Sequence, residues 1–267
     1  MAELERRFGR EAFGGDPANY DSARPPYPEA TWQALRARAG LRAGIDILEI
    51  GAGTGLATRS LLAHRPRRIV AVEPDPRLAA YLAENIGDPR LEVVGEPFET
   101  APLEPASFDL VASATAFHWL DPIPALRCIR ELLRPGGHVA LWWNIFGEPG
   151  RTDAFHEATT HLFAGHPTSP SGGGTVRLPF GLDSAARGAD FAAAGLVADP
   201  AEVIRWTLRL DAHAMRRLYA TYSNVTALPP EARKRLLDGL VEVAEQQFGG
   251  AVERNMATAI HIARAPA

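Results

Sequence analysis

The chain has 267 residues, of which 46% are hydrophobic and 22% charged. These values match ordinary globular proteins and exclude wholesale disorder, collagen-like repeats and coiled coils. The net charge is −4 at pH 7 and the basic residues are scattered, so the positive field used in non-specific nucleic-acid binding is missing. The single cysteine, Cys128, excludes an intrachain disulfide, and no stretch approaches the ~18 apolar residues of a membrane span. We expect a cytoplasmic protein with neither a nucleic-acid nor a membrane partner.

The first forty residues contain a proline-rich turn, RPPYP at 24–28, followed by a segment typical of a helix over 29–39. Proline, glycine and serine make residues 1–28 poor material for a core. We expect this region to pack over one end of the domain as a lid.

The next hundred residues alternate between short apolar runs and helix-like segments. The apolar runs lack polar alternation, which is typical of a parallel sheet covered on both faces. Their succession predicts right-handed strand–helix–strand units and hence an α/β fold. The strands are expected at 45–50, 69–73, 91–94, 108–113 and 138–145, with helices at 56–64, 76–86 and 122–133.

The pattern is looser after Gly147. It predicts a helix at 152–165, a flexible loop at 167–175, a helix near 184–194, a strand near 202–210, two helices, and a last strand near 256–264. We expect this half to decorate the sheet rather than to form a second core.

The most informative motif is DILEIGAGTG at 46–55, in which a buried strand meets glycines at alternate positions before a helix. Without Cβ atoms, Gly51, Gly53 and Gly55 allow positive φ and a close approach of the backbone to a ligand. The helix that follows offers unpaired N–H groups. The spacing does not fit the G-x-G-x-x-G pattern of dinucleotide-binding proteins, which disfavours a pyrophosphate ligand.

Two carboxylates flank this turn. Glu49 lies two residues before Gly51, where it would attract a cationic ligand and repel a pyrophosphate. Glu73 ends the next predicted strand, eighteen residues past Gly55, where an acidic side chain can accept both hydroxyls of a ribose. The pair therefore predicts a nucleoside that carries a positive group.

Four segments, LEIGAGTG, VAVEPD, FDLVASATAFHWLD and LLRPGGHVALWW, resemble the class I S-adenosylmethionine-dependent methyltransferases in order and spacing. RPPYP and the pair His118-Trp119 further resemble the bacterial small-molecule branch related to trans-aconitate methyltransferase. The resemblance implies a doubly wound, mostly parallel seven-stranded sheet of the Rossmann-like methyltransferase kind, with the last strand antiparallel and helical cap elements. It also implies S-adenosyl-L-methionine as cofactor and a small-molecule substrate.

By the same resemblance the whole chain, 1–267, is one methyltransferase domain. Residues 1–40 would be the lid and first helix, 41–147 the cofactor-binding core, and 148–267 a C-terminal half with substrate-cap helices. The cofactor residues implied are Glu49, Gly51, Gly53 and Gly55 around the methionine part, Glu73 at the ribose, Phe98 beside the adenine, Ala114 on the methionine side, and Tyr20 as a cover.

Two residues are candidates for catalysis, each with a structural alternative. His118 follows the fourth strand and is a candidate general base, or else a core histidine held by a hydrogen bond. Tyr222 is a candidate for orienting a polar substrate, or else part of a helix C-terminus. The five-residue spacing of His156, His161 and His166 places them off a shared helix face, so no metal is expected.

The sequence therefore predicts direct methyl transfer from S-adenosylmethionine to an oxygen, nitrogen or carbon of a small molecule. Two other functions stay open: a protein that binds this cofactor without methyl transfer or for another reaction such as cyclisation, and a nicotinamide-dependent oxidoreductase. Residues 113–116 read SATA, not the N/D-P-P-Y/F tetrapeptide of enzymes that methylate nucleobase amines, which disfavours that chemistry. A movable cover formed by 1–28 and 168–181 is also expected, because the transfer must exclude water.

Overall fold

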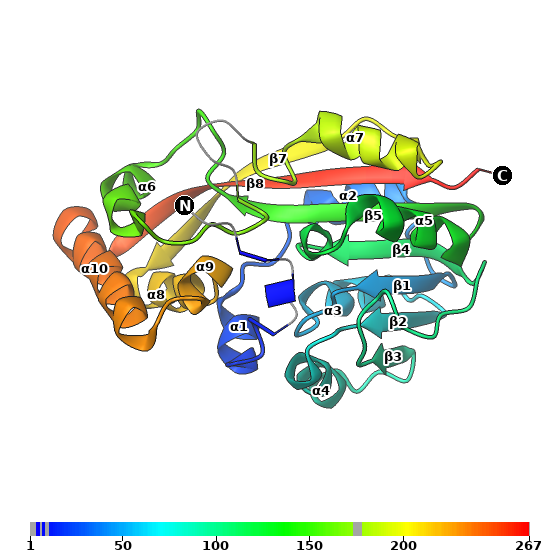
Figure 1. Ribbon diagram of the computed structural model, residues 1–267, viewed down its shortest axis with the longest axis horizontal. Helices are drawn as coiled ribbons and strands as arrows, with labels where there is room; N and C mark the ends of the chain where they lie inside the picture. The colour runs from blue at the N-terminus through cyan, green and yellow to red at the C-terminus, as the bar shows by residue number, and fades with distance from the viewer. Residues whose placement is uncertain (1–3, 6, 9–10, 173–177, 267) are drawn as a thin grey trace.

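Figure 1 shows a computed structural model of the chain, which describes residues 4–5, 7–8, 11–172 and 178–266. Helices and strands alternate through its first half, as the sequence predicts. The elements are α1 (Pro17–Ala23), α2 (Glu29–Arg38), β1 (Asp46–Ile50), α3 (Leu56–Ala63), β2 (Arg68–Val72), α4 (Pro76–Asn85), β3 (Leu91–Val94), β4 (Phe108–Ala114), the 3₁₀ turn η2 (Phe117–Trp119), α5 (Pro122–Leu132), β5 (Leu133–Phe146), α6 (Ala154–Thr159), the 3₁₀ turn η3 (Thr160–Phe163), α7 (Ser184–Ala193), β6 (Val197–Ala198), β7 (Glu202–Asp211), α8 (Ala212–Ala220), α9 (Ser223–Thr226), α10 (Pro230–Phe248) and β8 (Ala251–Arg264).

The described residues form one sheet of eight strands in the order β3-β2-β1-β4-β5-β8-β6, with β7 also paired to β8. The pairs among β1 to β5 are parallel, and β8 is antiparallel to β5. The predicted doubly wound, mostly parallel fold is confirmed. The strand count differs from seven because β6 and β7 pair with successive stretches of β8 and together occupy one edge position. Pro200 lies in the gap between them, and proline has no N–H for a ladder.

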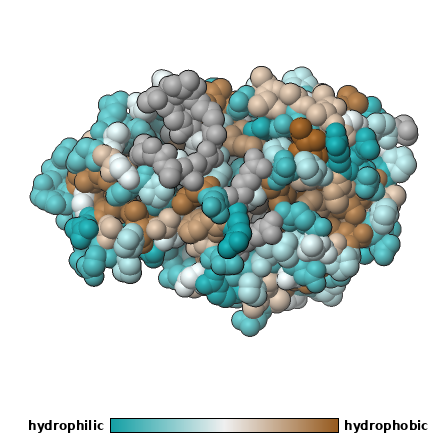
Figure 2. All heavy atoms as spheres, in the orientation of Figure 1, coloured by the Kyte–Doolittle hydropathy of each residue, from teal (hydrophilic) through white to brown (hydrophobic). Residues whose placement is uncertain are grey.

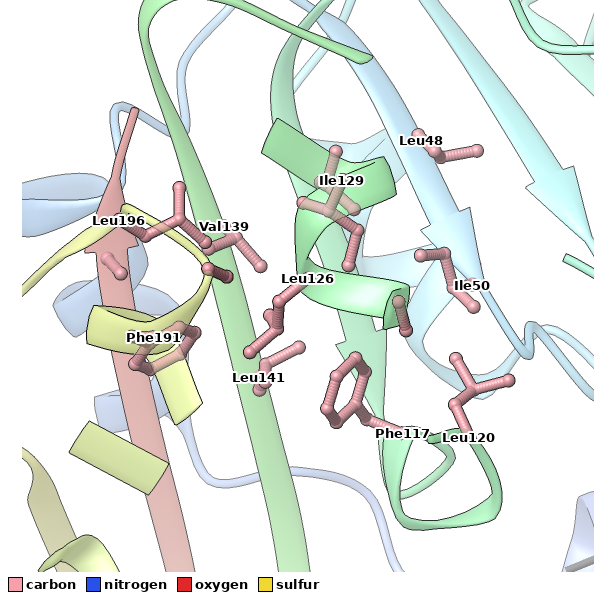
Figure 3. Close-up of a cluster of buried hydrophobic side chains, with 14 of the residues drawn as sticks. Leu48, Ile50, Phe117, Leu120, Leu126, Ile129, Val139, Leu141, Phe191 and Leu196 are labelled. Atoms are coloured by element: carbon pink, nitrogen blue, oxygen red, sulfur yellow. The ribbon is translucent and has the colours of Figure 1, made fainter. Parts of the chain in front are cut away.

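The sheet is covered on both faces, as its apolar strands require. Successive residues of β1, such as Ile47 and Leu48, belong to different buried clusters. Helices α2 and α3 cover one face, while α5 and α7 cover the other. Figure 3 shows the second of these clusters, with Phe117 of η2 and Leu120 just after it beside Leu126 of α5 and Leu141 of β5. The sheet is therefore rigid where its strands end.

The C-terminal half has a hydrophobic core of its own, which corrects the expectation that it only decorates the sheet. Met215 and Tyr219 of α8, Leu236 and Leu240 of α10, and Phe155 of α6 are buried together. Figure 1 shows these helices as a cap beside the sheet, with one end of β8 reaching towards α10. We call α6, α8, α9 and α10 the cap. β8 begins five residues earlier than predicted because its first residues pair with β7 at the cap.

Surface exposure is ordinary for a folded chain. Figure 2 shows hydrophilic residues over much of the viewed face, interrupted by brown groups over the cap on the left and over the sheet on the right. Leu178 and Val197 are the large hydrophobic residues found exposed among those described. No helix in the described residues has the length and apolarity needed to cross a bilayer. The predicted loop 167–175 lies partly outside the described residues.

Candidate functional site

A cleft opens where β1, β2, β4 and β5 end, which is where ligands bind in open parallel sheets. The cleft is bounded by the N-terminal segment and α1 on one side and by the glycine-rich turn on the other. Seven residues that the sequence predicts as cofactor contacts line it: Tyr20, Glu49, Gly51, Gly53, Glu73, Phe98 and Ala114. The structure therefore brings these predicted residues together at one site.

The three glycines of the turn have three different environments. All have positive φ, at +70° for Gly51, +58° for Gly53 and +92° for Gly55, so each suits glycine. A Cβ on Gly51 would lie 2.4 Å from the Cβ of Ala116, whereas a Cβ on Gly53 would meet nothing within 4 Å and would enter the cleft. Gly55 lies outside the cleft, because a Cβ there would lie 2.6 Å from side-chain atoms of Leu82 and Ile86. Its glycine is explained by packing between α3 and α4.

Glu73 is fixed by the backbone around it. Its Oε2 accepts a hydrogen bond from the Gly53 N–H at 2.8 Å, and its Oε1 accepts one from the Asp75 N–H at 3.0 Å. The residue is only 5% exposed, and this burial raises the pKa of its carboxyl to about 7. Each oxygen keeps further acceptor capacity, so the carboxylate can still take two hydroxyls from a ligand.

Glu49 lies deeper at the base of the cleft. It is 1% exposed, and its Oε2 has no hydrogen-bond partner in the described part of the chain. Burial raises the pKa of this carboxyl to about 8, and the neighbouring Glu73 carboxylate adds to the rise. A buried carboxylate oxygen without a hydrogen-bond partner costs free energy, and a ligand cation placed beside it would remove that cost.

The N-terminal segment closes over the cleft and is fastened to the sheet domain. The Asp75 carboxylate accepts a hydrogen bond from the Gly14 N–H at 3.1 Å and is paired with Arg77, whose Nη2 also donates to the Glu11 carbonyl at 2.7 Å. In α1, Asp21 accepts two hydrogen bonds from Arg59 of α3. The predicted lid is thus in contact with the domain here, although residues 1–3, 6 and 9–10 lie outside the description.

The far wall of the cleft contains Thr115 and Asn144, which the sequence interpretation did not single out as site residues, beside Tyr27 of the RPPYP turn. Tyr27 shares a hydrogen bond with the Thr115 hydroxyl at 2.9 Å, and the Asn144 side chain donates to the carbonyls of Pro25 and Pro26 at 3.3 and 3.4 Å. Thr115 has φ of +56°, a strained value for a β-branched residue, directly after β4. These contacts join the RPPYP turn to the ends of β4 and β5, and RPPYP itself was the signal for them.

Comparisons with known proteins agree with this arrangement. Residues 48–141 match the sequence profile of a family described as a methyltransferase domain. An uncharacterized methyltransferase from Schizosaccharomyces pombe is 35% identical over 133 residues, which are 50% of this chain and 52% of that one. An uncharacterized methyltransferase from Geobacillus thermodenitrificans is 30% identical over 162 residues, 54% of this chain and 74% of that one. An Anaeromyxobacter dehalogenans structure, proposed to be a type II methyltransferase, has a TM-score of 0.64 at 24% identity and covers 91% of this chain and 97% of its own.

The chain belongs to the class I S-adenosylmethionine-dependent methyltransferases. It spans about half the length of the first curated relatives that it matches, 52% of one and 54% of the next. The match of residues 48–141 covers the glycine turn, Glu73 and the strand that ends at Ala114.

His118 of this methyltransferase lies behind the cleft wall and does not line the cleft. It is 4% exposed, and its Nδ1 accepts a hydrogen bond from the Trp143 indole at 3.1 Å. Its ring also packs against Trp119 and Phe180, with centroids 5.0 and 6.3 Å away. This position is that of a core histidine, whereas the role of a base would need contact with an acceptor in the cleft.

Tyr222 of this methyltransferase also lies outside the cleft lining, behind Phe146, which does line it. The two ring centroids are 5.0 Å apart, and the Tyr222 hydroxyl is buried with no partner among the described residues. Burial raises the pKa of this phenol well above its ordinary value. A phenol in this state can donate a hydrogen bond but is a poor base near neutral pH.

The histidines of α6 and η3 form no metal site in the described part of this methyltransferase. No group of three or more His, Cys, Asp or Glu side chains is arranged there to hold a metal ion. His156 packs near Gly147, while the ring of His166 lies against Phe163.

Proposed function

We propose that this protein binds S-adenosylmethionine in the cleft and transfers its methyl group to a small molecule. One observation carries the proposal: two buried carboxylates, Glu49 and Glu73, flank a glycine turn whose middle glycine leaves the space beside it open. The two carboxylates would repel a pyrophosphate and attract a cation. This arrangement therefore fits a nucleoside with an ammonium group better than a nicotinamide dinucleotide.

Different residues would bind different parts of the cofactor. Glu73 would accept the two ribose hydroxyls, because the N–H groups of Gly53 and Asp75 hold its carboxylate in one orientation. Glu49 would pair with the ammonium of the methionine part, which would stabilise its ionised form. Phe98, which is buried and lines the cleft, would pack against the adenine. The bound cofactor supplies a methyl group on a cationic sulfur.

The acceptor would occupy the other half of the cleft, between α1 and the ends of β4 and β5. Phe13, Tyr20, Trp119 and Phe146 give this half an aromatic lining, and Asn144 adds a polar edge. An aromatic lining excludes water and favours a compact molecule with an apolar body. Orientation of the acceptor atom in line with the methyl group would supply much of the rate, at most roughly 7 to 11 kcal/mol.

Calorimetric titration tests the cofactor half of the proposal. We expect the protein to bind S-adenosylmethionine and S-adenosylhomocysteine and to bind NADH far more weakly. Glu73→Gln should weaken binding of both by about ten- to a hundred-fold, since hydrogen bonds to a charged group contribute roughly 1.5 to 3 kcal/mol. Glu92→Gln, on the exposed side of the neighbouring strand β3, is the control and should change nothing.

Glutamine is chosen over alanine because of the contacts of Glu73. An alanine there would leave the N–H groups of Gly53 and Asp75 both without acceptors and would destabilise the fold by about 1 to 3 kcal/mol, whereas a glutamine keeps an acceptor for one of them. An unchanged dissociation constant in Glu73→Gln would refute the ribose assignment. Tighter binding of NADH than of S-adenosylmethionine would refute the proposal as a whole.

The transfer itself is tested with unlabelled S-adenosylmethionine and a small-molecule extract. A product 14 Da heavier than its precursor, formed together with S-adenosylhomocysteine, identifies the acceptor. Tight cofactor binding without any such product would support a cofactor-binding protein or a different reaction instead.

A further inference from the structure

A chain of hydrogen bonds leads from the edge of the sheet to the acceptor half of the cleft. On β7, the indole Nε1 of Trp206 donates to the Thr258 hydroxyl of β8 at 2.9 Å. The Thr258 hydroxyl donates in turn to the side-chain Oδ1 of Asn144 on β5 at 2.7 Å. Asn144 lines the cleft, whereas Trp206 and Thr258 lie outside its described lining. The chain therefore joins two residues remote from the ligand to one that can contact it.

This chain of hydrogen bonds has one direction. An indole N–H can only donate, so the Thr258 oxygen accepts from Trp206 and its own hydrogen is left for Asn144. Thr258 is fully buried, so its hydroxyl is held in this orientation away from solvent. The oxygen end of the Asn144 amide is thereby held towards β8, and its amino end faces the RPPYP turn.

The amino end of Asn144 keeps capacity for a ligand. Its Nδ2 donates to the carbonyls of Pro25 and Pro26 at 3.3 and 3.4 Å. Both distances exceed the usual N–H···O range of roughly 2.7 to 3.2 Å, so both bonds are weak. Pro25 lines the cleft beside Asn144, and a ligand oxygen at a shorter distance would replace one of these bonds.

The two hydroxyls beside Asn144 differ from it in this respect. Tyr27 and Thr115 share a hydrogen bond at 2.9 Å in which either hydroxyl can donate. The Thr115 oxygen also accepts a long hydrogen bond, at 3.4 Å, from the backbone N–H of Asn144. Of these three side chains, Asn144 is the one whose donor and acceptor ends are fixed by its partners.

We propose that Asn144 donates a hydrogen bond to an oxygen of the methyl acceptor, and that Thr258 and Trp206 are positioning residues that keep its amino end on the cleft side. This inference rests on the proposed function and narrows the acceptor to molecules in which a carbonyl-type oxygen lies beside an apolar body. Aromatic rings such as Phe146 would hold the body, and the amide would determine which way its oxygen points.

The test uses two small probes of similar shape, acetophenone and cumene, of which acetophenone alone has a carbonyl oxygen. Ligand-observed NMR on the full chain, saturated with S-adenosylhomocysteine, gives both dissociation constants without any turnover. The quantity compared is the dissociation constant of cumene divided by that of acetophenone. The difference in hydrophobicity between the probes is the same for every variant, so it cancels when these ratios are compared.

Asn144→Asp is the direct variant, because it keeps the oxygen that accepts from Thr258 and replaces the amino group with a second oxygen. The ratio should fall at least tenfold. Thr258→Val leaves the amide oxygen without its donor, so the amide is no longer fixed and the ratio should fall about threefold. Thr258→Ser restores the hydroxyl and should restore the wild-type ratio. The matched control, Thr207→Val, makes the same change at an exposed threonine of β7 and should leave the ratio unchanged.

Trp206→Phe keeps the test decisive if Thr258→Val does not fold. Trp206 is only half-buried, and phenylalanine keeps a ring at this position while it removes the donor that sets the direction of the chain. The ratio should fall in the same direction as in Thr258→Val and by less. Melting temperatures are recorded for every variant.

A purely structural role gives a different result. If Asn144 only fastens the RPPYP turn, Asn144→Asp and Thr258→Val melt lower but keep the wild-type ratio, which overturns the proposal. A wild type that does not bind acetophenone overturns it as well.

A contact of Asn144 with the cofactor is also distinguished. 5′-methylthioadenosine has the adenine and ribose of S-adenosylhomocysteine but lacks its amino-acid group. If the neutral variants Thr258→Val and Trp206→Phe weaken S-adenosylhomocysteine tenfold and leave 5′-methylthioadenosine unchanged, the amide binds the cofactor and the proposal is wrong. Failure of the proposed function is separate, because wild type would then bind neither S-adenosylmethionine nor S-adenosylhomocysteine.

Discussion

The two halves of the cleft are built in different ways. The half around Glu49 and Glu73 comes from consecutive segments, β1 to the loop after β3, and its contacts are made by backbone N–H groups and buried carboxyls. The opposite half comes from α1, the RPPYP turn and the ends of β4 and β5, with aromatic rings and one guanidinium. The first half suits a ligand with a set pattern of charge, and the second suits a ligand with an apolar body.

The two halves also differ in what holds them in place. Hydrogen bonds from backbone to carboxylate fix the first half within a rigid sheet. In the second half, Asn19 donates to the Arg217 carbonyl at 3.3 Å and Arg24 to the Thr221 carbonyl, so α1 is tied to the cap. A change in the cap can therefore reach the acceptor half without disturbing the glycine turn.

The largest expected effect separates binding from folding within the glycine turn. Gly53→Ala should weaken cofactor affinity about a hundred-fold, because its Cβ would enter the open cleft, and should cost only about 1 to 2 kcal/mol of stability for the left-handed backbone. Gly51→Ala should mainly destabilise the fold, by about 2 to 4 kcal/mol, because its Cβ would overlap with Ala116.

Calorimetry and thermal melts on both variants measure the contrast. Gly53→Ala that binds S-adenosylhomocysteine as wild type does would show that the turn does not contact the cofactor. Gly51→Ala with an unchanged melting temperature would show that the ends of β1 and β4 can separate without cost.

A smaller effect is expected from His118→Ala, which tests whether a residue behind the cleft wall takes part in catalysis. The variant leaves the Trp143 indole without its acceptor, so we expect a loss of about 1 to 3 kcal/mol and a melting temperature lower by several degrees. Cofactor affinity should stay within threefold of wild type. Turnover should fall only modestly.

The double variant His118→Ala with Trp143→Phe is the control, because it removes donor and acceptor together and should cost less than the sum of the single changes. A stable His118→Ala protein whose turnover is 10² to 10⁴ times lower would instead establish the histidine as the general base.

The sequence predicts the first half of the cleft because its determinants are local. The buried strand, the alternate glycines and the carboxylate at the end of the next strand are close together in the sequence. The strand–turn–helix path therefore determines how they lie relative to one another. Gly55 is the exception, since its neighbours Leu82 and Ile86 lie in α4 and directly after it, and the motif does not reveal them. Motif spacing identifies a glycine without saying whether a ligand or a side chain requires it.

The second half of the cleft could be predicted less fully from the sequence, because its contacts join segments that are far apart in the chain. Arg24 meets Thr221, and Asn144 meets Pro25, across more than a hundred residues in each case. His118 illustrates the same limit: its position after β4 places it near the cleft, but the side of the wall on which it lies depends on Trp143 and Phe180. Such pairings depend on tertiary packing.

The smallest expected effect is a pH dependence of cofactor affinity that belongs to the first half alone. Burial raises the pKa of Glu49 to about 8, so without ligand this carboxyl is mostly protonated at pH 6. An ammonium beside it favours the ionised form, so binding releases a proton and affinity rises with pH. Between pH 5.5 and 7 we expect S-adenosylhomocysteine to bind about tenfold more tightly, because an α-amino group stays charged over this range.

Glu49→Gln and 5′-methylthioadenosine isolate the cause. The pKa of Glu73 is raised to about 7, so it contributes in the same direction, but its partner is the ribose, which both ligands contain. The pH profile of S-adenosylhomocysteine in Glu49→Gln should therefore match that of 5′-methylthioadenosine in wild type. Folding must show the opposite sign: a carboxyl with a raised pKa stabilises the protein below about pH 4.5 and loses that contribution as pH rises towards 8, so Glu49→Gln should melt higher than wild type at pH 8. Equal pH profiles of S-adenosylhomocysteine binding in Glu49→Gln and wild type would show that Glu49 does not pair with the ammonium. The cation would then lie in the acceptor half of the cleft.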